Sequence, residues 1–571
     1  MERGGSGGTA GHGEDGGTDR GADNATARGV DGDVDRGVDV CVVGAGPVGL
    51  TLAIGLRRLG LGVRIVDAAP ETKREARALV LWARAREALH ALGVGGVLDE
   101  HGVELSAVTV HARGRPLGEL TTGWAHSAFA RPLNIEQHVI ERLLAGELAG
   151  LGTRVEWNTA VTDVKVHDDR AEFTLRHGDG RVESGSAPWI VGCEGTRSVV
   201  RDRLGIAFEG HRRTGLQVVQ GNALPTWPLA EEPGRGHIFL APRRALLVFP
   251  LPDGGYRFFC FRDDPDPSLG AAPTLDELRD LVAETARMPG LRLAPAPSRW
   301  LNRARFSDRV AARLRSGRGL LAGDAAHAWA PVGGHGMNVG VLGAHNLAWK
   351  LAAVHRGEAG DALLDTYDAE QRLMALRYIR EMRFNFMELP LPPLAHRAFT
   401  ATVPAALART GFRRRLDLRL SDLGRHHRDG PLSAHVPGTG RGPGARAGDR
   451  MPDASVVPAE PGPGARGPGE TVRLHRLLAY GTWTLVLHAA RADTVTLGAL
   501  RAACATVPFP VRLLPVTPAD ARAEAALGAP AELRLVRPDG YVGLVAPLGG
   551  VERLREYLAA RAAGARAVGR V

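Results

Sequence analysis

The order of apolar and polar positions along the chain predicts a mixed α/β protein. In the first and last thirds, short apolar runs such as "VDVCVVG" alternate with stretches whose apolar residues recur at helical spacing. The middle of the chain, residues 215–300, contains strand-like segments instead, including "HIFLAPRRALLVFPLP" and "YRFFCFR". The pattern therefore predicts an α/β domain that carries an inserted β-rich module.

Two segments interrupt this pattern. Residues 1–37 are rich in Gly, Asp and Arg with hardly any large apolar side chain, so burial cannot repay the entropy of ordering and a disordered tail is predicted. Residues 434–470 are dense in Pro and Gly, which is typical of a long loop or linker. We expect a helical segment and this linker over residues 401–470, followed by a separate domain over residues 471–571.

Length, charge and cysteine content narrow the class of protein. The 571 residues suffice for two or three domains, and no apolar run approaches the roughly 20 residues that span a bilayer. Without a signal-peptide core at the start, a cytoplasmic location and no membrane partner are predicted. The net charge of +9 is modest and the arginines are scattered, which argues against nucleic acid but suits an anionic ligand. Four widely separated cysteines predict neither a disulfide framework nor a metal site.

The first chemical motif is a nucleotide-binding βαβ unit over residues 38–71. A buried-strand run precedes Gly44-x-Gly46-x-x-Gly49, and a helix and a second strand ending at Asp67 follow. These glycines suit a tight turn, close approach of a pyrophosphate and close helix packing, while the helix N-terminus favours an anion. The terminal carboxylate suits ribose hydroxyls, but the motif alone does not separate FAD from NAD.

A second Gly-rich loop lies in "LLAGDAAHAWAPVGGHGMN", residues 320–338. We expect a strand ending at Ala322, a Gly-Asp turn, and a helix from about Met337 whose apolar positions are 341, 344, 347, 348, 351 and 354. Asp324, at the end of that strand, could accept a hydrogen bond from a polyol, or could simply cap the turn.

Four ordered motifs together resemble the class A flavoprotein monooxygenases, the para-hydroxybenzoate hydroxylase family. They are the βαβ unit with the following "KREARALVLWARAREALHALGV", then "NIEQHVIERLLAGEL", "WIVGCEGTRSVVRDRLGI" and the second Gly-rich loop. Within the family, the chain is similar to bacterial aromatic polyketide hydroxylases. The resemblance implies a Rossmann-like FAD-binding domain over 38–214 and 301–400, a β-rich substrate-binding insertion over 215–300, and a thioredoxin-like domain over 471–571.

The resemblance also assigns roles to individual residues. It implies that the ADP half of FAD contacts Gly44, Gly46, Pro47, Gly49 and Asp67, that Arg77 and Arg84 lie on a flexible loop near the phosphates, and that Gln137 and Glu194 also contact the cofactor. It places Asp324 on the ribityl chain and the flavin ring at Gly336, Met337 and Asn338. The catalytic face of the ring would be lined by Pro331, Gly333, Gly334 and His335.

Three positions depart from the family pattern. Glu194 replaces the usual Asp, His335 the usual Gln, and Gly343 the usual Asp. An imidazole at position 335 could shuttle protons, although a tolerated loop substitution is the simpler interpretation. Phe249, Phe258 and Phe259 are candidates for the substrate wall, with a core role favoured.

The implied activity is FAD-dependent monooxygenation of a polycyclic aromatic, polyketide-like substrate. NADPH or NADH would reduce FAD, O₂ would add at C4a, and the hydroperoxide would transfer one oxygen atom to the ring. Baeyer–Villiger or decarboxylating oxygenation, and a flavin-binding protein without turnover, remain alternatives. Failure to bind FAD would instead favour an NAD-binding dehydrogenase. A homo-oligomer is possible.

The C-terminal segment carries two further signals. The solitary Cys504 argues against disulfide exchange, and Asp539-Gly540 predicts a hairpin turn.

Overall fold

The computed structural model describes residues 37–72, 78–124, 126–229, 232–263, 272–385, 390–442, 444–460 and 469–565. The predicted tail over residues 1–37 lies outside this range except for Gly37. From Val38 onward the chain forms one compact unit. Among the described residues, no helix combines the length and apolar character needed to cross a lipid bilayer.

A mostly parallel sheet holds the predicted βαβ unit. Its strands, in spatial order, are β19 (Arg315–Ser316), β20 (Gly319–Leu321), β12 (Trp189–Gly192), β1 (Val40–Val43), β2 (Val63–Val66) and β8 (Val155–Glu156). Strand β1 is buried throughout and pairs in parallel with β2 and β12, so the apolar run of the sequence becomes a central strand. Helix α1 (Pro47–Arg58) connects β1 to β2, which confirms the predicted strand–helix–strand order. The carboxyl ends of β1, β2, β12 and β20 therefore meet at one edge of this sheet.

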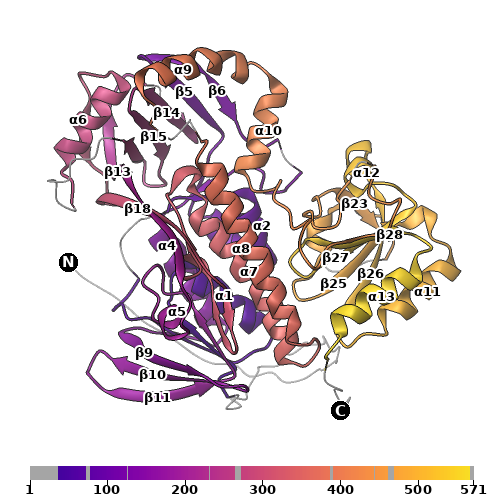
Figure 1. Cartoon of the computed structure of the whole chain (residues 1–571). Coiled ribbons are helices and arrows are strands. Elements are labelled where there is room, and N and C mark those ends of the chain that lie inside the picture. The colour runs from indigo at the N-terminus through magenta and orange to yellow at the C-terminus, as the bar shows by residue number, and fades with distance from the viewer. Residues whose placement is uncertain are drawn as a thin grey trace, which may run out of the picture. The chain divides into compact units, whose positions relative to one another are not determined.

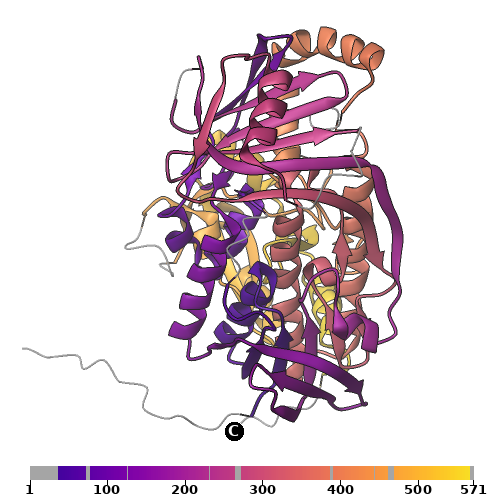
Figure 2. The same ribbon diagram turned by 90° about the vertical axis from the view of Figure 1, so that its left-hand side faces the viewer.

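A larger, mainly antiparallel sheet forms the β-rich part of the molecule (Figure 1). Among described residues its strands, in order, are β21 (His327–Ala328), β18 (Leu301–Ala311), β13 (Phe208–Thr226), β16 (Tyr256–Arg262), β15 (Arg244–Pro250), β14 (Arg235–Ala241), β5 (Ala107–Ala112) and β6 (Arg115–Thr121), with β17 (Arg292–Pro295) paired to β13. The strand-like sequence segments of residues 237–262 are confirmed as β14, β15 and β16. Long β13 and β18 are visibly curved (Figure 2). Strands β5 and β6 also belong to this sheet, although they precede the predicted insertion, residues 215–300, by about a hundred residues.

Helices cover the sheets and carry the second Gly-rich loop. They are α2 (Ala83–Ala91), α3 (Gly95–Asp99), α4 (Gln137–Gly150), α5 (Val199–Arg203), α6 (Leu275–Ala286), α7 (Gly336–His355), α8 (Ala362–Met382), α9 (Pro393–Leu407) and α10 (Thr410–Leu420). The expected helix from about Met337 is confirmed as α7, which runs beside α8 (Figure 1). Val48 of α1 packs against α7, where a Cβ on Gly340 would lie 2.5 Å from its Cγ2. Small sheets are formed by β3 (Val80–Leu81), β7 (Leu133–Asn134) and β4 (Val103–Glu104), and by β9 (Thr159–Val166), β10 (Ala171–His177) and β11 (Val182–Ala187).

The C-terminal segment folds around a further sheet. Its strands, in order, are β22 (Ala434–His435), β28 (Val542–Pro547), β27 (Glu532–Val536), β25 (Trp483–His488), β26 (Val511–Pro518), β23 (Ser455–Pro458) and β24 (Val472–Arg473), with helices α11 (Thr494–Cys504), α12 (Ala521–Leu527) and α13 (Val551–Ala562). Strand β25 pairs in parallel with β26 and antiparallel with β27. The Asp539-Gly540 hairpin is confirmed between β27 and β28.

Part of the Pro- and Gly-rich segment predicted as a linker belongs to this sheet. Strand β22 pairs with β28 and β23 with β26, so residues 434–458 add strands on both sides of the C-terminal fold. The prediction of a long loop or linker was wrong at these strands, because backbone pairing with distant partners overrides the local turn signals.

Candidate active site

One cavity of about 770 Å³ connects the two Gly-rich loops with the β-rich sheet and with helix α10. Of the predicted site residues that the structure describes, the cavity is lined by Gly44, Gly46, Pro47, Asp67, Gln137, Glu194, Asp324, Pro331, Gly333, Gly334, Gly336 and Met337. The fold thus brings together residues that are up to about 290 positions apart in sequence.

The first Gly-rich loop forms one end of the cavity. Gly44 has φ +103°, and a Cβ there would lie 2.7 Å from the carbonyl carbon of Cys193, so the loop requires glycine. A Cβ on Gly49 would overlap the carbonyl oxygen of Gly44; this residue serves helix packing and does not line the cavity. Helix α1 begins at Pro47 and, within the described residues, has no side-chain cap. Its N-terminal N–H groups therefore suit an anionic ligand.

Asp67 holds this loop in place. At the carboxyl end of β2, its Oδ2 accepts the N–H of Ala45 at 2.7 Å and its Oδ1 accepts the N–H of Ala69 at 2.8 Å. The carboxylate still lines the cavity, so its predicted contact with ribose hydroxyls is compatible with a second role in fixing the backbone.

The second Gly-rich loop lines the same cavity. After β20 the chain makes short 3₁₀ turns at Gly323–Ala325 and Val332–Gly334 before α7 begins at Gly336. Gly333 and Gly334 have φ +80° and +66°, conformations that favour glycine. In the described part of the chain, α7 also begins without a side-chain cap, so a second helix N-terminus opens on the same cavity.

His335 does not line this cavity, which overturns its predicted position on the reacting face. Its side chain is buried and packs behind the loop, where its ring centroid lies 5.6 Å from the ring centroid of Trp82. Nδ1 lies 3.1 Å from Oδ2 of Asp422. Asn338 is also turned away, because its side chain bonds the backbone of Trp82, Val80 and Gly334. Both residues shape the loop from behind.

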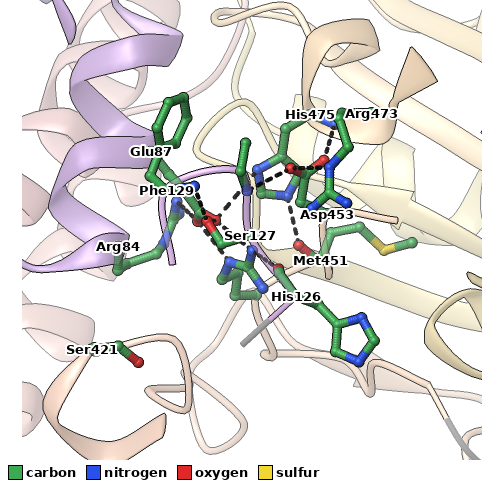
Figure 3. Close-up of polar contacts among 12 residues, drawn as sticks. Arg84, Glu87, His126, Ser127, Phe129, Ser421, Met451, Asp453, Arg473 and His475 are labelled. Atoms are coloured by element: carbon green, nitrogen blue, oxygen red, sulfur yellow. Dashed lines mark hydrogen bonds and ion pairs between the residues drawn. The ribbon is translucent and has the colours of Figure 1, made fainter. Parts of the chain in front are cut away.

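Arg84 is a second correction. It lies in helix α2 and not on a flexible loop, and its guanidinium donates to the carbonyl of Asp539 at 2.6 Å and pairs with Glu87. Glu87 in turn accepts a hydrogen bond from Ser127 Oγ at 2.6 Å (Figure 3). Glu87 also binds Arg450. Arg84 therefore links α2 to the C-terminal segment, for which its sequence gave no signal. Arg77 lies outside the described residues.

Gln137 and Glu194 stand at the cavity wall. Gln137 accepts the N–H of Ala78 at 3.1 Å and donates to Glu141 at 2.9 Å, which fixes its amide at the start of α4. Glu194 Oε1 accepts the N–H of Val200 at 2.8 Å, whereas its Oε2 is buried without a hydrogen-bond partner among the described residues. Burial raises the pKa of this carboxyl. The longer side chain thus binds the first turn of α5, which Ser198 caps, and its second oxygen packs beside Gly192 of β12.

The far wall of the cavity is apolar, and sequence reasoning found only part of it. Phe249 and Phe259 line the cavity, whereas Phe258 is fully buried in the core on the other face of the sheet. The missed members are Val108, Leu120, Ile238, Leu247 and Phe261 from the large sheet, Leu105 and Trp329 from the segments next to β5 and β21, and Arg413, Leu416, Asp417 and Leu420 from α10. Strict alternation along β16 could have separated Phe258 from Phe259 and Phe261, but nothing local marks α10.

Asp417 is an acidic group within that apolar wall. Its Oδ2 accepts the N–H of Trp124 at 3.0 Å. Burial raises the pKa of this carboxyl to about 6, despite the opposing effect of the Trp124 and Gly123 N–H groups. A carboxyl in this state can serve as either donor or acceptor near neutral pH.

The arrangement fits FAD. Two helix N-termini face one cavity, as the pyrophosphate and the electron-rich edge of a reduced flavin ring require, and glycines of both loops leave room for the cofactor. Within the described residues, no cluster of His, Cys, Asp or Glu is arranged to hold a metal ion.

Comparison with known proteins decides the family. The FAD binding domain family model matches residues 37–382, more than half of the chain. The 6-methylpretetramide 4-monooxygenase of Streptomyces rimosus is 34% identical over 546 residues, which cover 91% of this chain and 93% of that enzyme. The chain belongs to the class A flavoprotein monooxygenases. FAD is accordingly its cofactor.

Other relatives of this flavoprotein monooxygenase match about nine tenths of its length. A dialkyldecalin synthase of Streptomyces rugosporus is 32% identical over 529 residues, covering 90% of this chain and 98% of that protein. The crystal structure of aklavinone-11 hydroxylase with FAD and aklavinone superimposes with a TM-score of 0.70 at 26% identity, covering 92% and 99% of the two chains. The similarity therefore includes the C-terminal segment.

Proposed function

We propose that this flavoprotein monooxygenase hydroxylates a polycyclic aromatic, polyketide-like substrate, with NADPH or NADH as reductant and O₂ as the oxygen source. The observation that carries the proposal is the cavity of about 770 Å³, where the N-termini of α1 and α7 meet an aromatic and aliphatic wall. The relatives that act on 6-methylpretetramide and aklavinone support a fused-ring substrate. A reductant of this kind also suits the cytoplasmic location that we propose.

Within this proposal, bound FAD supplies the activation of O₂, and the protein supplies position and shielding. Gly44, Gly46 and Pro47 would hold the ADP half, with Asp67 on the ribose and Asp324 on the ribityl chain. Gln137 and Glu194 would contact the cofactor at the wall. The N-terminus of α7 at Gly336 and Met337 would stabilise negative charge on the reduced ring.

The substrate would lie against the apolar wall, whose side chains exclude water from the reaction. Pro331, Gly333 and Gly334 leave the ring face open on that side. Asp417 would exchange a hydrogen bond with a substrate hydroxyl, fixing which ring faces the flavin. The mechanism asks no protein residue to act as a nucleophile.

The proposal includes a division into parts. Residues 38–214 and 301–400 would bind FAD, residues 215–300 with β5 and β6 would shape the substrate wall, and residues 471–571 would form a thioredoxin-like domain. Support for the last part comes from its order β25, α11, β26, α12, β27, β28 and α13, with β27 antiparallel to its neighbours. With one cysteine, this part would serve structure and not thiol exchange.

The deciding experiment supplies the FAD-loaded protein with NADPH or NADH, ¹⁸O₂ and a panel of fused-ring phenols. Hydroxylation predicts faster NAD(P)H consumption with a fitting phenol, and a product heavier by one ¹⁸O atom. A lactone or a product that has lost CO₂ would instead assign Baeyer–Villiger or decarboxylating oxygenation. A protein that stays colourless with added FAD would refute every flavin-dependent assignment.

A second candidate is a flavin-binding protein without redox turnover. The similarity to dialkyldecalin synthase over 98% of that protein favours it, because that relative is named for a ring-forming activity. This candidate predicts a yellow protein whose NAD(P)H consumption no aromatic substrate accelerates.

A further inference from the structure

The His335 ring supports the second Gly-rich loop directly from behind. A Cβ on Gly333 would lie 2.6 Å from Cδ2 of His335, so the imidazole and the Gly333 backbone are in close contact. Trp82 stacks on the same ring, and its Nε1 donates to the carbonyl of Gly333 at 2.9 Å. The position of the His335 ring therefore fixes the backbone on which the flavin ring would rest.

The same imidazole is joined to the end of helix α10. Oδ2 of Asp422 lies 3.1 Å from Nδ1 of His335, and both side chains are buried. The hydroxyl of Tyr378 and Nε of Arg425 donate to the other oxygen, Oδ1. Burial alone would raise the pKa of Asp422, but His335, Arg425 and Tyr378 more than offset it and lower the pKa. One ionised carboxylate thus gathers three donors from three segments.

Asp422 follows immediately behind the cavity-lining face of α10. Leu416, Asp417 and Leu420 of that helix line the substrate side of the cavity, and Asp422 lies two residues beyond Leu420. Asp422 has φ +60°, an uncommon conformation for a residue other than glycine, which directs its carboxylate into the cluster. A further bond anchors this turn, from the N–H of Arg84 to the carbonyl of Ser421 at 3.1 Å.

We propose that the hydrogen bond between His335 and Asp422 couples the flavin-side loop, residues 331–336, to the substrate-side helix α10. The two residues are positioning residues, because neither lines the cavity. The bond keeps the loop and the substrate wall at one spacing, and motion at either end is transmitted to the other. The catalytic consequence, though not the coupling itself, rests on the proposed function.

The test is hydrogen–deuterium exchange on the full-length, FAD-loaded protein, read by peptide. Because coupling is reciprocal, Asp422→Asn should speed exchange in residues 331–336, and His335→Gln should speed exchange in residues 410–420, by about tenfold each. His335→Asn places an amide where Nδ1 lies and can retain the bond, so α10 should keep its protection in that variant. Equal loosening by the Asn and Gln variants would overturn the coupling and leave only ring packing.

A matched control is His345→Gln. His345 is buried in the same helix α7, and its ring packs on Tyr480 away from the loop. This variant should leave exchange in residues 410–420 unchanged even if it lowers the overall stability. Loss of protection spread evenly over the chain in the Asp422 and His335 variants would also overturn the proposal. If His335→Gln does not fold, Asp422→Asn and Tyr378→Phe, which removes one donor to Asp422, still decide it through residues 331–336.

A second measurement concerns the reaction and separates the two proposals. In Asp422→Asn, the KM for the aromatic substrate and the share of O₂ released as H₂O₂ should both rise severalfold. If no substrate is ever hydroxylated, the proposed function fails while the exchange result stands. If hydroxylation occurs, and Asp422→Asn changes neither the share of O₂ released as H₂O₂ nor the exchange of residues 331–336, only this inference fails.

Discussion

At the scale of single residues, Asp417 shows how an apolar wall changes the chemistry of one carboxyl. Its side chain is 5% exposed, among residues such as Leu416 and Leu420, and burial raises its pKa to about 6. A carboxyl with a raised folded-state pKa binds its proton more tightly when folded than when unfolded. Stability from this group is therefore present at low pH and lost as the pH rises.

Asp417→Asn should remove that pH dependence. Between the ordinary pKa of an aspartate, about 4, and the folded value near 6, the wild type should lose about 3 kcal/mol of unfolding free energy relative to the variant. Above pH 6 the difference should be constant. Urea unfolding at several pH values measures it, with Glu552→Gln on the exposed face of α13 as the control that follows the wild type. Parallel curves for Asp417→Asn and the wild type would contradict the raised pKa.

At the residue scale, the sequence predicted the loop glycines but not the directions of the larger side chains. Glycines such as Gly44 and Gly333 could be predicted because their spacing reports a backbone requirement that is local. The directions of Arg84 and His335 could not, since each is decided by a partner far along the chain, Asp539 for the first and Asp422 for the second. A charged or aromatic side chain near a ligand loop carries no local sign of which side it faces.

At the scale of elements, the contact between α1 and α7 keeps the two halves of the cofactor site together. Val48 packs into a space left by Gly323 and Gly340, where added Cβ atoms would lie 2.9 Å and 2.5 Å from its methyl groups. The alternation of strands and helices predicted both helices, but their packing pair could not be read from the sequence, because small residues in a helix have many possible neighbours. The backbones approach closely only because both positions lack a side chain.

Gly340→Ala should therefore separate the two cofactor loops. The added methyl group must displace Val48, which we expect to cost about 1–3 kcal/mol of stability and to weaken FAD binding about tenfold or more. Isothermal titration of the apoprotein with FAD, together with thermal unfolding, measures both effects. Gly146→Ala in α4 is the matched control, since no atom lies within 4 Å of the new Cβ. FAD affinity equal in the two variants would show that the spacing of α1 and α7 does not set the site.

At the scale of the whole molecule, a buried ionic cluster joins the C-terminal hairpin to helices α7 and α8. Glu370 accepts a hydrogen bond from Nζ of Lys350 at 2.8 Å and from each terminal nitrogen of Arg537, at 2.5 Å and 3.0 Å. Asp539 also binds Arg537 and accepts the amide of Asn346 at 2.7 Å. The sequence predicted this hairpin but not its buried ion pairs with α7 and α8, because pairing over long distances has no local pattern.

Glu370→Gln should destabilise the protein by about 3–5 kcal/mol at pH 7, because it leaves Lys350 and Arg537 buried with one carboxylate fewer. Burial alone would raise the pKa of Glu370, but Arg537 and Lys350 more than offset this and hold it well below its usual range. The stabilisation is therefore complete above the unfolded pKa of about 4.3 and is lost as the pH falls, so the difference in unfolding free energy between wild type and variant should narrow below that pH.

Denaturation followed by tryptophan fluorescence is suited to the measurement, since the ring centroids of Trp349 and Trp483 lie 5.7 Å apart beside this junction. The exposed pair of Glu552 and Arg555 provides the control, as Glu552→Gln should change stability by less than about 1 kcal/mol. A similarly small effect at Glu370 would mean that apolar packing, and not this cluster, holds the hairpin on the FAD-binding part.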